Sequence, residues 1–147
     1  MDLSLPEYRA LAQLRYEIRR FVHFSEEQSR RYGLEPQQHQ LLLAIRGLPD
    51  GVQATIGELA GRLQLKHHSM VELVDRLENH GYVPRIAGTD DRRQVIVHLT
   101  RAGARVLRQL SLAHRGELDT AGPSLSAALR SLRKARAGAS EHSWSIV

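Results

Sequence analysis

Apolar residues recur every three or four positions along most of the chain, with charged residues between them, as is typical of amphipathic helices. The pattern predicts helices over residues 6–31, 35–46, 55–63, 100–121 and 124–136. A further helix is expected after a short link at residues 64–66. Gly33, Gly81 and the pair Gly122-Pro123 stand where helices are expected to end. Residues 138–147 are expected to form a flexible tail.

Two local signals sharpen the middle of this pattern. Residues 55–58 read Thr-Ile-Gly-Glu, a capping box in which the Thr hydroxyl and the Glu carboxylate each accept a bond from a free backbone N–H. In the helix that follows the link, four apolar residues share one face and predict its core side: Met70, Leu73, Val74 and Leu77. Thr100 is placed to cap the helix that begins after it.

The period changes from 3.6 to 2 after Gly81, which predicts two short strands over residues 83–87 and 94–99. Val95, Val97 and Leu99 alternate and are expected on one face of the second strand. The polar residues 88–93 between the strands predict a hairpin tip. The fold class is therefore mainly α, with one two-stranded β element.

Two short helices with a tight link, followed at once by a basic hairpin, predict a winged helix-turn-helix. The first helix supports the second, whose polar face fits the DNA major groove, and the hairpin reaches the neighbouring minor groove. An ordinary amphipathic surface helix is the alternative. Candidate DNA-binding residues on the second helix are Lys66, His67, His68, Ser69, Glu72 and Arg76.

Composition and charge agree with this interpretation. The chain of 147 residues is long enough for one domain and carries a formal charge of +5. Nine basic residues against five acidic ones lie between Arg62 and Arg108, which suggests a polyanionic partner such as nucleic acid. The sequence contains no cysteine, which excludes disulfides and thiol-based sensing. No signal peptide or membrane span is expected, so we predict a cytoplasmic protein.

Several segments resemble the MarR (multiple antibiotic resistance regulator) family of winged helix-turn-helix transcription factors. They are residues 55–60, the run 70–83 with its Leu-Val-Asp-Arg-Leu-Glu sequence, and Asp-Asp-Arg-Arg at 90–93 followed by Leu-Thr-Arg-Ala-Gly at 99–103. The resemblance implies a homodimer in which residues 1–32 and 100–137 form the dimerisation helices. Residues 35–99 would then be the winged DNA-binding region, all within one compact domain. Apolar stripes that a single chain cannot bury fully also favour a two-fold dimer.

By position in the family, Arg92 and Arg93 match the wing arginines that approach the minor groove, and Asp91 matches the acid that orients one of them. Ser69 falls on a small hydroxyl residue near the start of the reading helix. Other positions depart from the family pattern. Glu72 would repel phosphate but accept a bond from a cytosine amine, and the pair His67-His68 is unusual there.

The resemblance also implies a small aromatic or phenolic effector, with Arg20, His23, Phe24 and His39 as candidate contacts. We expect no metal site, because the eight histidines lack ligand spacing. We also expect no cofactor and no enzymatic activity, because no catalytic motif is present. The expected function is a DNA-binding repressor of a near-palindromic operator. A protein–protein interaction module and a metal-responsive regulator remain the alternatives.

Overall fold

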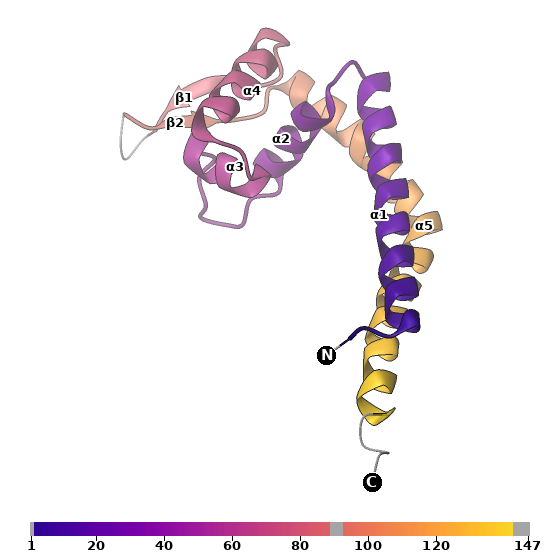
Figure 1. The fold of residues 1–147 in the computed structure, drawn as a ribbon. Helices are drawn as coiled ribbons and strands as arrows, with labels where there is room; N and C mark the ends of the chain where they lie inside the picture. Colours follow the sequence, from indigo (N-terminus) through magenta and orange to yellow (C-terminus); the bar gives the residue numbers. More distant parts are fainter. Residues whose placement is uncertain (1, 89–92, 143–147) are drawn as a thin grey trace. The chain divides into compact units, whose positions relative to one another are not determined.

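The structure, a computed structural model, describes residues 2–88 and 93–142 of the chain (Figure 1). Its elements are α1 (Leu5–Arg31), α2 (Pro36–Arg46), α3 (Ile56–Leu63), α4 (His67–Asn79), β1 (Arg85–Ala87), β2 (Val95–Val97) and α5 (Arg101–His142). The prediction of a mainly α fold with one two-stranded antiparallel sheet is confirmed. Within the described ranges, none of the helices has the length and apolar character needed to cross a bilayer.

The chain divides by its internal contacts into two compact units. The helical unit comprises Met1–Glu27 and Ala113–Val147, and the winged unit comprises Gln28–Leu112. The sequence predicted one compact domain with inner boundaries near residues 32 and 100. The observed division lies twelve residues later in α5, because Val106, Leu107 and Leu110 at the start of that helix are part of the core of the winged unit.

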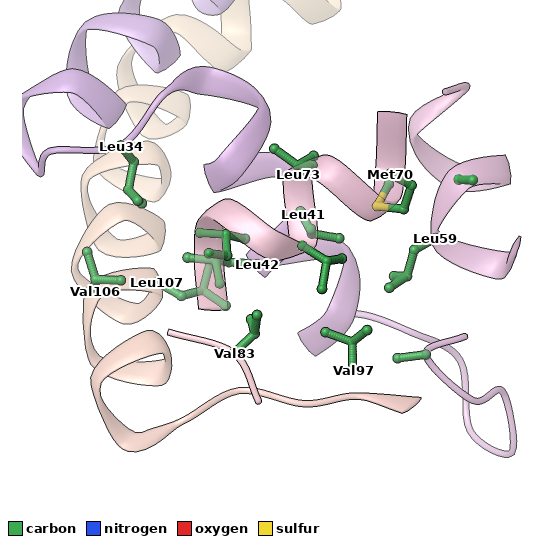
Figure 2. Packing of buried hydrophobic residues seen from close by; sticks show 14 of the residues in the cluster. Leu34, Leu41, Leu42, Leu59, Met70, Leu73, Val83, Val97, Val106 and Leu107 are labelled. Atoms are coloured by element: carbon green, nitrogen blue, oxygen red, sulfur yellow. The ribbon is translucent and has the colours of Figure 1, made fainter. Parts of the chain in front are cut away.

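The core of the winged unit gathers leucines, valines and a methionine from α2, α3, α4, β2 and the start of α5 (Figure 2). Met70, Val74 and Leu77 are fully buried and Leu73 nearly so, which confirms the predicted core face of α4. Burial of such side chains stabilises a fold by roughly 1.5–3 kcal/mol each. The apolar side of α4 therefore faces into the unit, and its other side is left for solvent.

Helix α3 begins with only half of the predicted capping box. The Thr55 hydroxyl accepts a bond from the Glu58 N–H at 3.2 Å, as expected. The Thr55 N–H, however, donates to the Gln53 carbonyl at 2.9 Å, and the Glu58 carboxylate accepts from Arg62 instead. The reciprocal half of the box was thus predicted wrongly. The Gln53 carbonyl binds the Thr55 N–H, and Arg62, one turn further along α3, binds the Glu58 carboxylate.

The N-terminus of α1 carries a cap that the sequence analysis missed. The Ser4 N–H and the Ser4 hydroxyl both donate to the Glu7 carboxylate, at 2.7 and 2.8 Å. These bonds favour the ionised form and lower the pKa of Glu7 below its ordinary value. The carboxylate also lies in the first turn, where negative charge is favourable.

The predicted helix break at Gly122-Pro123 was wrong, because α5 is a single helix from Arg101 to His142 with Pro123 inside it. A proline removes one hydrogen bond and costs about 3 kcal/mol in a helix interior, but its fixed φ is itself helical. The turns on either side supply enough bonds for the helix to continue. The helix also runs five residues into the predicted tail, and residues 143–147 lie outside the described part of the chain.

The second strand departs from the predicted alternation. Val97 is buried as expected, but Val95 is 37% exposed and Ile96, on the other face, is only 8% exposed. The reason is a further pairing, since Ile96 bridges Thr55 and the Val97 N–H donates to the Ala54 carbonyl at 2.9 Å. β2 therefore has backbone neighbours along both edges, β1 on one side and residues 54–55 on the other, and the simple alternation of a two-stranded hairpin does not apply.

The entry to α5 is held by close backbone contact. The predicted cap is confirmed, because the Thr100 hydroxyl accepts from the Gly103 N–H at 3.0 Å. The same hydroxyl donates to the Gly81 carbonyl at 2.7 Å, and the Thr100 N–H donates to the Tyr82 carbonyl at 3.0 Å. A Cβ atom at position 103 would lie 2.2 Å from the Tyr82 oxygen. Only glycine fits there without moving backbone.

We predict that Gly103→Ala destabilises the winged unit by roughly 1–3 kcal/mol, because the new methyl group overlaps a backbone carbonyl that cannot rotate away. Urea unfolding followed by circular dichroism measures the change. Gly116→Ala in the same helix is the matched control, since a Cβ there meets nothing within 4 Å. That variant is expected to be neutral or stabilising by up to about 1 kcal/mol. Equal midpoints for the two variants would contradict the close contact.

Candidate nucleic-acid interface

Helices α3 and α4 are joined by a sharp turn, as the sequence predicted. Gln64 ends α3 in the left-handed conformation, with φ 54° and ψ 42°, and the Leu65 N–H donates back to the Ala60 carbonyl at 2.9 Å. A left-handed residue other than glycine is strained by roughly 1–2 kcal/mol. The strain is balanced by the burial of Leu59 on α3 and Met70 on α4, which both belong to the core. The turn therefore presents α4 at a defined angle to α3.

The side of α4 opposite the core carries the polar residues that the sequence analysis selected. Five of the candidates are exposed and Ser69 is half-buried; the exposed ones are Lys66, His67, His68, Glu72 and Arg76. Their exposure leaves them available to a partner that lies along the helix. Glu72 stands among the basic residues, so this face carries mixed charge.

The amino end of α4 is suited to an anion. Lys66 is the N-cap residue, and its side chain forms no capping hydrogen bond. The first turn carries no acidic residue. Backbone N–H groups at a helix start point outward and attract phosphate oxygens, and a cap carboxylate would block them. This end therefore combines unblocked amides with the positive charge of Lys66.

The wing lies beside this end of α4 (Figure 1). Strands β1 and β2 pair antiparallel, with Arg85 opposite Val97 and Ala87 opposite Val95. The Gly88 N–H adds a bond to the Gln94 carbonyl at 2.9 Å. Of the predicted wing residues, Arg93 is exposed at the start of the returning strand. Asp91 and Arg92 lie outside the described residues.

Arg85 is a site residue that the sequence analysis missed. Its guanidinium forms an ion pair with the Asp75 carboxylate on α4 and donates to the Val71 carbonyl at 3.3 Å. These contacts join the first strand of the wing directly to α4. No spacing rule connects an acid on a helix with an arginine on the next strand, so the local sequence carried no signal for the pair.

A cleft of about 490 Å³ opens between the start of α3, the start of α4 and the wing. From the predicted DNA-binding set it brings together His67 and Arg93, and Arg85 lines it as well. His68, Glu72 and Arg76 do not line this cleft. The other described residues that line it are Thr55, Ile56, Gly57, Val71, Gln94 and Val95.

The candidate effector residues have separate surroundings. In the helical unit, Arg20 lies 3.9 Å from the Glu17 carboxylate, and exposed His23 lies 3.2 Å from that of Glu27. Phe24 instead packs edge-on against the His114 ring. His39 belongs to the winged unit, where it is buried in α2. Among residues 2–88 and 93–142, no group of three or more His, Asp or Glu residues is placed to hold a metal ion.

We predict that Arg85→Ala and Asp75→Asn each loosen the wing without unfolding the unit. The pair is partly exposed, at 31% and 48%, so its loss costs less than about 1 kcal/mol. Hydrogen exchange of the strand amides should rise in both variants. The double variant should be no worse than either single one, because the two residues act together.

Arg62→Ala is the matched control for this prediction. It breaks an ion pair of similar exposure, between Arg62 and Glu58 within α3. Exchange in the wing should stay unchanged in that variant. A similar rise in all three single variants would show that the wing responds to general charge loss and not to the contact with α4.

Comparison with known proteins relates the middle of the chain to one family. Residues 32–94 match the sequence model of the MarR family. The chain is 33% identical over 79 residues to the uncharacterized HTH-type transcriptional regulator YsmB of Bacillus subtilis. That match covers 54% of this chain and 52% of YsmB, so the chain spans about half the length of the curated relative it matches.

Solved structures share the fold. AbsC, a MarR family transcriptional regulator from Streptomyces coelicolor, superimposes with a TM-score of 0.73 at 22% identity, over 97% of each chain. A mutant of MepR from S. aureus bound to an oligodeoxyribonucleotide matches with a TM-score of 0.62 at 18% identity, over 88% of this chain and 93% of MepR. The MarR family model therefore matches the part of the chain that holds the helix-turn-helix and the first strand of the wing, and the solved structures share the fold over most of the chain.

Proposed function

We propose that this protein is a transcriptional regulator that binds duplex DNA through α4 and the wing. The observation that carries the proposal is the two-sided construction of α4. One face is buried in the core, and the other presents Lys66, His67, His68 and Arg76 to solvent. Arg93 on the adjoining wing extends this basic surface. A major groove admits a helix of this kind, and a wing arginine reaches the backbone or the minor groove beside it.

We further propose that the protein acts as a homodimer through its helical unit. The apolar residues that this unit leaves exposed support the proposal: Leu3, Leu5, Tyr8, Leu11, Tyr16, Ile18, Val22, Leu118 and Leu129. Leu11, Ile18 and Val22 recur along α1 at helical spacing, so they form one stripe. A second copy of the chain would cover such a stripe. The two α4 helices of the dimer, one from each subunit, would then bind half-sites about one helical turn apart in a near-palindromic operator.

Within this proposal, the protein represses transcription by occupying its operator, and a small aromatic anion releases it. Arg20, His23, Phe24 and His39 remain the proposed effector contacts. An effector of this kind must bind the DNA-incompetent arrangement more tightly, because only differential affinity shifts a population. A loss of operator binding on titration with salicylate or a related phenol is the direct measurement.

The DNA-binding proposal predicts that Arg93→Ala weakens binding by roughly ten- to a hundredfold and leaves the protein folded. The probe is a duplex recovered by selection from a random pool, titrated in a gel-shift assay at several salt concentrations. The logarithm of affinity should fall with log salt by about 0.9 per phosphate neutralised. Arg115→Ala removes the same charge from the helical unit and serves as the control. A salt-independent profile would favour a protein–protein module instead.

The dimer proposal predicts that Val22→Glu converts the protein to a monomer, because a charge in the centre of an apolar interface is strongly unfavourable. Sedimentation velocity measures the mass. Leu43→Glu introduces the same charge at a residue of equal exposure, 44% against 45%, but in the winged unit. That control is expected to remain a dimer. A wild-type protein that sediments as a monomer would remove this part of the proposal.

A further inference from the structure

Among the described residues that line the cleft between α3, α4 and the wing there is one histidine, His67. His67 is the first residue of α4, is exposed, and lines the cleft together with Arg85 and Arg93. The described lining of the cleft therefore places one imidazole beside two guanidinium groups.

The charged groups around His67 come from three elements. The wing contributes Arg93 and Arg85, and the charge of Arg85 is offset by its ion pair with Asp75 on α4. Lys66 precedes His67 in the chain. The start of α3 contributes only the uncharged residues 55–57 to the cleft lining. Acidic Glu72 lies on α4 but not in the cleft, one turn beyond His68.

We propose that His67 binds a DNA phosphate in its protonated form, so that duplex binding takes up a proton and strengthens as the pH falls from about 8 to about 6. This inference rests on the proposed function, because it assigns the phosphate to bound DNA. The protein would then be a regulator whose occupancy of DNA responds to acidification.

The chemistry of imidazole accounts for the coupling. A neutral ring has one N–H donor and one acceptor nitrogen, and the acceptor repels a phosphate oxygen. The protonated ring has two donors and a positive charge, and charge-assisted bonds to phosphate are stronger. A phosphate in the cleft also meets the backbone amides at the start of α4. Binding of an anion that prefers the protonated imidazole is therefore coupled to the uptake of a proton by the protein.

His98 provides an internal comparison. It is exposed in the same winged unit, directly after β2, and it is not among the described residues that line the cleft. It also lies outside the proposed DNA-binding set. A change in the pH dependence of DNA binding that follows His67→Gln but not His98→Gln is therefore assigned to His67.

The experiment measures the affinity of the full chain for a mixed-sequence duplex from about pH 6 to pH 8 at constant low ionic strength. Wild-type protein and His98→Gln should bind about fivefold more tightly per subunit at the acid end. This is the effect expected when a phosphate makes protonation of one histidine roughly tenfold more favourable. His67→Gln should lose most of that dependence. His67→Lys should bind tightly throughout the range, since its charge is permanent.

Calorimetric titration in two buffers of different ionisation enthalpy counts the protons directly. Wild type should take up protons on binding duplex, and His67→Gln should take up fewer. Tight duplex binding by wild type with no pH dependence, or an unchanged pH dependence in His67→Gln, would overturn the inference while leaving the DNA-binding proposal intact. A protein that binds no duplex at any pH would instead overturn the proposed function.

Discussion

The packing of the apolar face of α4 onto α2 and α3 is the interaction on which the rest of the winged unit depends. A helix of this length is only marginally stable alone in water, so its conformation comes from tertiary contacts. Met70, Val74 and Leu77 supply those contacts, and each is fully buried. The same packing turns Lys66 and Arg76 outward. The exposure of the polar face of α4 thus follows from the burial of its apolar face in the core.

The wing depends on the rest of the unit in a similar way. Two strands of three residues each do not form a stable sheet in isolation. β2 is therefore held by its bridge to Thr55, and β1 by the contact of Arg85 with Asp75. The first of these joins the wing to the start of α3, and the second joins it to α4. Helix and wing consequently form one continuous surface, as binding to adjacent grooves of a duplex requires.

The helical unit has the opposite distribution of polarity. It buries Glu7, Glu17 and Ser25, while leucine, isoleucine and valine side chains of α1 remain exposed. The Ser25 hydroxyl lies 2.7 Å from the His114 ring nitrogen, so α1 and α5 contact each other partly through polar groups. An apolar stripe left outside such a contact is typical of an interface with another subunit. This distribution is the physical basis of the proposed dimer.

The sequence by itself determined the features that depend on near neighbours. Helical periodicity predicted the core face of α4, and the residues 64–66 predicted the tight link before it. The Thr100 cap and the positive φ at Gly81 also follow from local chemistry. The basic residues of α4 were selected in the same way, since polar positions are visible in the helical pattern. Arg93 was selected from its place in the polar hairpin and from the family resemblance.

Tertiary structure decided the features that need a distant partner. Ile96 is buried because Thr55 pairs with it, and Arg85 joins the site because Asp75 lies across from it on α4. The local sequence Gly122-Pro123 favours the end of a helix, yet α5 continues through it because the helical turns on both sides are hydrogen-bonded. Hydrogen bonds between residues three or four positions apart can be predicted from the local sequence. Contacts between helices and strands depend on how these elements pack, and no local sequence pattern predicts that packing.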